Sequence, residues 1–118
     1  MATKKDGKKD GASQLAAKIA EMTDADRAIA EPLHEAILAA DADLEQRLWY
    51  SQPAYAKDGK VVCFFRGADV DGERYVSLGF SGRANLDDGN VWPTSYAVTE
   101  VTAADAKTIT ALVKKAVS

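Results

Sequence analysis

The stretch WYSQPAYAKDGKVVCFF, residues 49–65, decides the fold. It holds an aromatic pair, a proline at position 53, a tight turn at Asp58-Gly59 and an apolar run over residues 61–65. Short apolar runs separated by Pro and Asp-Gly turns are typical of antiparallel strands. The stretch therefore predicts a small antiparallel sheet in which Pro53 ends the first strand. The apolar run predicts a strand covered on at least one face, and we expect the ring of Phe64 in the core.

Alternation and turn residues predict the remaining strands around this stretch. A strand over residues 44–50 precedes it, and residues 75–80 alternate between apolar and small or polar side chains. A fourth strand region spans residues 91–101 and is interrupted early by Pro93. Residues 66–74 form a polar hairpin loop with Asp71-Gly72 as its turn. Residues 81–90 form a loop with a helical turn at Ala84–Asp88.

Helical spacing of apolar residues places helices at both ends of the chain. A short helix starts at Ser13, its predicted N-cap, and ends near Met22. Thr23 caps a second helix, whose apolar stripe keeps its phase across Pro32 and so predicts a kinked continuous helix. A third helix follows a capping signal at residues 102–105 and carries its apolar stripe to Ala116.

This order of elements predicts the α+β class. We expect a two-layer sandwich, with an antiparallel sheet of about four strands and the N-terminal and C-terminal helices packed on one face. A chain of 118 residues has the length of a single domain. We assign residues 13–118 to that domain and predict that residues 1–12, which are rich in Lys, form a disordered leader.

Composition narrows the classes of protein. Residues 1–12 carry four Lys and two Asp, so in a protein of net charge −3 the rest of the chain has a net charge of −5. A net-negative body repels phosphates, which argues against a nucleic acid partner. No apolar run approaches the roughly 20 residues that cross a bilayer. A single cysteine, Cys63, fits a reducing compartment, and we expect a cytoplasmic protein.

Three segments together resemble the bacterial YdhG-like family. They are the opening stretch, then YVSLGFSGRANLDDGNVWPTSYAVTEVT, then a C-terminal helix that ends LVKKAV, and the resemblance covers residues 24–117. The family is grouped with the frataxin-like fold and is often described as intracellular iron chaperones. The resemblance implies an acidic surface that collects ferrous iron and passes it to an iron-acceptor protein. The acidic ridge of frataxins is thin in this chain.

Two groups of residues are candidate iron ligands. On the second helix, Glu31 and Glu35 are one turn apart, with Asp24 and the single histidine, His34, nearby. Carboxylates with one imidazole suit weak, labile binding of ferrous iron. The alternative is an ordinary solvated acidic helix face. Asp87 and Asp88 are adjacent carboxylates on a loop, and the alternative there is a simple turn.

Aromatic residues offer a different kind of site. Trp49, Tyr55 and Trp92 could line a small-molecule pocket or a partner groove, and the alternative is that such rings fill the core. Cys63 lies in an apolar strand, so we expect a buried structural thiol.

Two hypotheses for the function follow. The first is a non-catalytic iron-delivery chaperone, carried by the family resemblance. The second is a protein-interaction or small-ligand module that uses an aromatic groove on the sheet. We expect no enzyme, because residues for acid–base or covalent catalysis are few, and we expect a monomer or a weak dimer.

Overall fold

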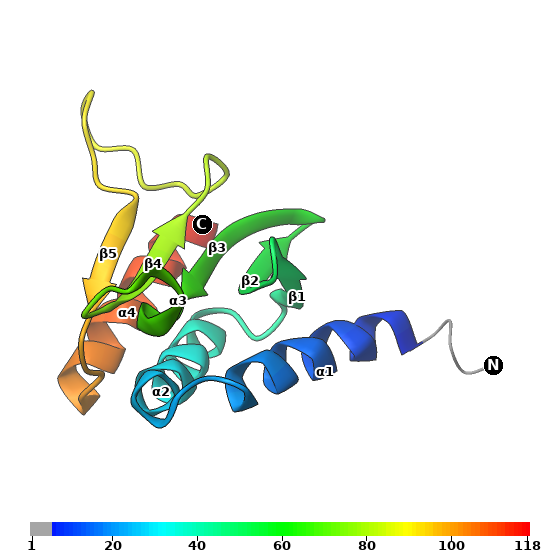
Figure 1. Ribbon diagram of the computed structural model, residues 1–118. Helices are drawn as coiled ribbons and strands as arrows, with labels where there is room; N and C mark the ends of the chain where they lie inside the picture. Colours follow the sequence, from blue (N-terminus) through cyan, green and yellow to red (C-terminus); the bar gives the residue numbers. More distant parts are fainter. Residues whose placement is uncertain (1–5) are drawn as a thin grey trace.

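The computed structural model describes the backbone of residues 6–118 and the side chains of residues 11–118. Helices at both ends of the chain pack against a five-stranded antiparallel sheet of order β1-β2-β3-β4-β5 (Figure 1). This arrangement confirms the predicted α+β class. The elements are α1 (Asp6–Ala20), α2 (Asp24–Ala40), β1 (Glu45–Trp49), β2 (Gln52–Lys57), β3 (Lys60–Arg66), α3 (Ala68–Asp71), β4 (Val76–Phe80), β5 (Ser95–Val98) and α4 (Ala103–Val117).

The sequence does not predict the strand β2, because Pro53 is expected to end the first strand. Pro53 instead lies inside β2, opposite Leu48 of β1. Pairing with β3 begins one residue later, at Ala54, so the missing N–H of proline costs no bond on that side. The hairpin turn is Tyr50-Ser51, and both residues have positive φ, at 53° and 64°. Two consecutive residues with positive φ suit the right-handed twist of a hairpin.

A β-bulge in β3 decides which side chains face the core. Tyr55 pairs with Cys63 and Ala56 pairs with Val61, so Val62 is an extra residue between them. A bulge breaks the alternation of faces. Val62 and Cys63 both become buried, whereas Val61 is partly exposed.

The expectation that Phe64 lies in the core is wrong for the same reason. Phe65 is 0% exposed and packs in the core, whereas Phe64 is partly exposed. The ring of Phe64 lies across Gly79 of β4, where an added Cβ would stand 2.5 Å from the ring. A glycine at position 79 is therefore needed to seat this ring.

One core joins the sheet to the helices. Tyr55 and Lys57 of β2 reach α2 and the end of α4, which defines the inner face of the sheet. Phe64 and Gly79 lie on the opposite side, which we call the outer face. The buried side chains of the core include Leu15, Ile19, Leu33, Ile37, Tyr55, Cys63, Phe65, Val76, Leu78, Phe80, Ile109 and Val113.

The first helix is longer than predicted. It begins at Asp6, seven residues before the expected N-cap Ser13, and packs along β1. An added Cβ at Gly11 would stand 2.4 Å from the carbonyl oxygen of Gln46, so the glycine allows a close approach of helix and strand. Of the predicted leader, residues 6–12 belong to α1, and residues 1–5 lie outside the described part of the chain.

The helices α2 and α4 begin at the positions that their capping residues predict. The hydroxyl of Thr23 accepts from the N–H of Asp26 at 3.2 Å, and α2 continues through Pro32 to Ala40. Thr102 and Asp105 form a complete capping box at the start of α4. None of the helices over residues 6–118 has the length and apolar character needed to cross a membrane.

Two loop predictions differ from the structure. The loop between β3 and β4 contains a short helix, α3, and Gly72 follows it in the left-handed region with φ of 66°. The helical turn expected at Ala84–Asp88 is absent, because those residues form an irregular loop. The last strand is confined to Ser95–Val98, and the loop before it projects from the end of the molecule opposite α1 (Figure 1).

Candidate binding site on the outer face of the sheet

Aromatic side chains meet on the outer face. The ring of Trp49 contacts Phe64 edge-on, with ring centroids 5.1 Å apart, and contacts Tyr50 at 4.9 Å. Trp49 belongs to β1 and Phe64 belongs to β3, so their rings meet over the intervening strand β2. That strand presents Ala54 opposite Phe64, and Ala54 is fully buried. Small residues on β2 therefore let the larger side chains of its neighbours come together above it.

A hollow of about 350 Å³ lies beside Trp49. Three separate segments form it: β1, the start of β3 and the loop after β4. Its lining consists of Arg47, Trp49, Gly59, Lys60, Val61, Ser81, Gly82 and Arg83.

The backbone of each segment explains why these side chains converge. Arg47 is two residues before Trp49 on the same face of β1. Lys60 follows the tight turn at Asp58-Gly59, where both residues have positive φ, at 53° and 80°. The bulge at Val62 leaves Val61 outside the core and in the wall of the hollow.

The loop that carries Arg83 is tied to the sheet by Ser81. The N–H of Ser81 donates to the carbonyl of Val62 at 2.9 Å, and its hydroxyl donates to the carbonyl of Val61. The same hydroxyl accepts from the N–H of Arg83 at 3.0 Å. Further along, the N–H of Asn85 donates to the carbonyl of Ala116 in α4 at 2.8 Å. The third wall of the hollow is thus anchored at both ends.

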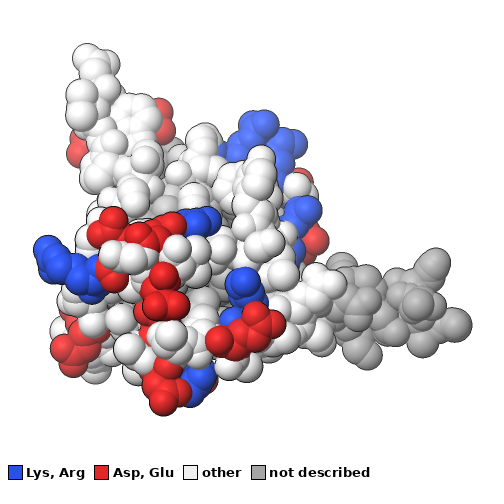
Figure 2. Space-filling model, viewed as in Figure 1, with Lys and Arg blue, Asp and Glu red and all other residues white. Residues whose placement is uncertain are grey.

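The hollow is basic. None of Arg47, Lys60 and Arg83 has an ion-pair partner among residues 11–118, whereas Arg27, Lys57 and Arg66 are each paired with an aspartate. Figure 2 shows basic atoms gathered at the upper right, over the end of the sheet where the β2–β3 turn lies in Figure 1. Acidic atoms predominate over the lower part of that view. Charges of one sign around a concave surface concentrate its potential.

Other cavities have a different character. A groove of about 610 Å³ runs between α2 and α4 and is lined largely by alanines and threonines. One of about 670 Å³ lies between β5 and α4 and has mainly aliphatic walls. A third, of about 680 Å³, is bordered by carboxylates at the start of α2, α3 and the end of β5. Among these cavities, which are formed by residues 11–118, the hollow beside Trp49 alone joins a tryptophan ring to three cations.

The predicted aromatic residues do not form one groove. Trp49 lies on the outer face. Tyr55 is 0% exposed on the inner face, and Trp92 packs against the core in the segment before β5. Of the three, Trp49 alone lines the hollow.

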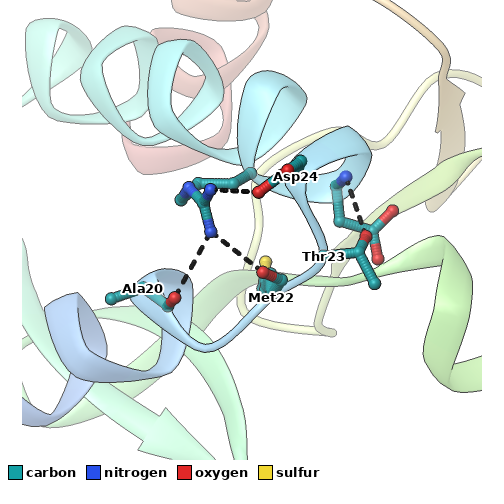
Figure 3. Close-up of polar contacts among 6 residues, drawn as sticks. Ala20, Met22, Thr23 and Asp24 are labelled. Atoms are coloured by element: carbon teal, nitrogen blue, oxygen red, sulfur yellow. Dashed lines mark hydrogen bonds and ion pairs between the residues drawn. The ribbon is translucent and has the colours of Figure 1, made fainter.

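The structure also separates the predicted iron ligands on α2. Asp24 forms an ion pair with Arg27, which also donates to the carbonyl of Met22 at 3.0 Å (Figure 3). Glu31 and Glu35 are exposed, and His34 turns to the core. Asp24 therefore helps to close the α1–α2 junction rather than joining the two glutamates.

Asp87 and Asp88 are exposed on the loop before β5. Over residues 11–118, no three His, Cys, Asp or Glu side chains come together in a group that could hold a metal ion. Iron binding remains a prediction from the family resemblance.

His34 takes part in a partly buried polar contact that the sequence did not predict. Its Nδ1 lies 2.8 Å from the hydroxyl of Tyr55, which joins α2 to β2. Burial lowers the pKa of His34, and the neighbouring Glu35 opposes this change. Burial, and then the nearby Cys63, raise the pKa of Tyr55. Burial also raises the pKa of Cys63 to about 12, so the thiol is unreactive at neutral pH, as expected of a structural cysteine.

Sequence reasoning missed Arg47, Lys60 and Arg83 as site residues. They come from three segments with no shared motif, and the convergence depends on strand pairing and on the turn of Ser81. Comparison with protein-family models, with curated proteins and with solved structures finds no match for the chain.

Proposed function

We propose that the protein is a non-catalytic module that binds a small molecule in the hollow beside Trp49. The observation that carries the proposal is the convergence of Arg47, Lys60 and Arg83 on one aromatic-walled hollow. Ligand sites combine apolar or aromatic walls with a few placed polar groups, and their volumes start at about 300 Å³.

The cost of keeping these cations together supports the proposal. Like charges that share a small region repel, and no carboxylate among residues 11–118 pairs with them. Such an arrangement does not stabilise the fold. It favours an anion that enters the hollow, because the anion relieves the repulsion.

The chemistry of the lining supports binding rather than catalysis. Its side chains are basic, aromatic, aliphatic or absent, apart from the hydroxyl of Ser81. That hydroxyl already donates to the carbonyl of Val61 and accepts from the N–H of Arg83. Acid–base or nucleophilic catalysis needs a base within reach of the reacting group, and the lining supplies no carboxylate, imidazole or thiol for this role. The proposed compartment is the cytoplasm, because Cys63 is a free buried thiol.

A fragment screen by nuclear magnetic resonance tests the proposal. The probe is a set of neutral, cationic and anionic heteroaromatic fragments, each added to ¹⁵N-labelled full chain. We expect hits to shift the amides of Gly59 and Gly82 and the indole N–H of Trp49. A Trp49→Leu variant should lose these shifts and keep its other signals. Hits that cluster in the α2–α4 or β5–α4 groove, or no hits at all, would contradict the proposal.

A further inference from the structure

We propose that the ligand of the hollow is a phosphate monoester carried on a planar ring. This inference rests on the proposed function and names the chemical class of its ligand. Two properties of the hollow lead to it: the number of cations around it and the aromatic wall beside them.

The charge balance favours a dianion. Arg47, Lys60 and Arg83 bring three positive charges to the hollow. A phosphate monoester carries about −1.5 to −2 at pH 7, whereas a monocarboxylate carries only −1. The phosphate therefore neutralises most of the local charge, and a carboxylate leaves two cations facing each other.

The kinds of cation also fit phosphate. A guanidinium presents a planar fork that can bind two oxygens of a phosphate at once, and an ammonium acts as a mobile point charge. With Arg47 on β1, Arg83 on the loop after β4 and Lys60 between them, the three can approach a tetrahedral group from different directions. Glycines at positions 59 and 82 leave the rim without side chains.

The hollow is largely formed before a ligand arrives. Arg83 sits on a loop that Ser81 ties to β3, and Lys60 begins β3 directly after the two-residue turn Asp58-Gly59. Fixed backbone segments lower the ordering cost of binding. Within reach of these cations, Trp49 offers a ring on which a planar group of the ligand can stack.

Calorimetry with four small probes tests the inference at pH 7.5 and low salt. They are phenyl phosphate, inorganic phosphate, benzoate and phenol. We expect phenyl phosphate to bind saturably and about tenfold or more tightly than any of the other three, because it alone supplies both the dianion and the ring. Its affinity should fall below about pH 6, where the phosphate loses one charge, and should fall as salt is added.

Single variants locate the binding. Arg83→Gln, Arg47→Gln and Lys60→Gln should each weaken phenyl phosphate about tenfold, the loss expected for one charge-assisted hydrogen bond. Arg74→Gln is the matched control, because Arg74 is an exposed arginine on the α3–β4 loop, outside the hollow. Retained signal dispersion in ¹⁵N spectra shows that each variant is folded.

The outcomes separate this inference from the proposed function. Benzoate binding as tightly as phenyl phosphate, or an equal loss in Arg74→Gln, would overturn the phosphate assignment. Inorganic phosphate that binds as tightly as phenyl phosphate would overturn the claim that the ligand carries a planar ring. In these cases, fragments that shift the NMR signals of Gly82 and Trp49 would still support a small-molecule site in the hollow. If every fragment leaves both signals unchanged, the proposed function is contradicted as well.

Discussion

Replacing Phe65 and Phe64 separately by alanine tests which ring supports the fold. Phe65 is 0% exposed and stacks on Tyr55, with ring centroids 6.3 Å apart. Removing a fully buried phenyl ring costs about 3–5 kcal/mol, from lost burial and from the cavity left behind. For a domain of this size, the melting temperature should fall by about 12–20 °C.

Phe64→Ala is the matched control in the neighbouring position. Its ring is partly exposed and contacts Trp49 and Gly79 rather than the helices. Partial burial and one edge-on aromatic contact amount to about 1–2 kcal/mol. Urea unfolding followed by circular dichroism gives both free energies. If Phe64→Ala lowers the free energy of unfolding as much as Phe65→Ala or more, the bulge is refuted and Phe64 lies in the core.

Three further predictions concern buried and charged groups. Because burial holds the pKa of His34 below its unfolded value of 6.5, its contribution to stability is present above pH 6.5 and lost as pH falls through the folded pKa. The urea midpoint should therefore fall from pH 7.5 to pH 5, and it should fall less in His34→Gln, which lacks the titrating imidazole. With its pKa raised to about 12, Cys63 should resist a thiol reagent in the native protein at pH 8 and react fully in urea; rapid native labelling would contradict its burial. Glu31 and Glu35 meet no third metal ligand among residues 11–118. The double variant Glu31→Gln/Glu35→Gln should therefore show nearly the same binding curve as the wild type when ferrous iron is titrated without oxygen. Saturable iron binding that the double variant abolishes would instead favour the chaperone hypothesis.

Local signals in the sequence predicted most of the elements. Thr23 and Thr102 marked the starts of α2 and α4 because their hydroxyls accept from backbone N–H groups of the first turn. Apolar periodicity located β3 and β4. Such signals act over a few residues, and they are visible without any knowledge of the partner strand.

The errors have equally local causes. The turn at Tyr50-Ser51 contains neither glycine nor asparagine, so the sequence carries no hairpin signal before β2. Pro53 even indicates the end of a strand at a position that lies inside β2. The bulge at Val62 depends on pairing with β2 and reversed the expected faces of β3. Long-range pairing of this kind cannot be predicted from apolar periodicity.

The candidate site could be predicted only in part. Trp49 was predicted as a binding residue from its aromatic character, and it lines the hollow. Lys60 and Arg83 follow Arg47 by 13 and 36 residues along the chain, in segments that meet only through the sheet and the bonds of Ser81. Tyr55 was predicted for the same groove, but its side chain points to the core. There its hydroxyl lies within hydrogen-bond distance of His34 Nδ1.

The most direct test of the central claim compares the two tryptophans of the chain in one titration. Phenyl phosphate is added to the ¹⁵N-labelled protein, and the indole N–H signals of Trp49 and Trp92 are followed. We predict a saturable shift of the Trp49 signal, together with shifts of the amides of Gly59 and Gly82, while the Trp92 signal stays in place. A shift of Trp92 without Trp49, or no saturable shift of either, would contradict a ligand site in the hollow.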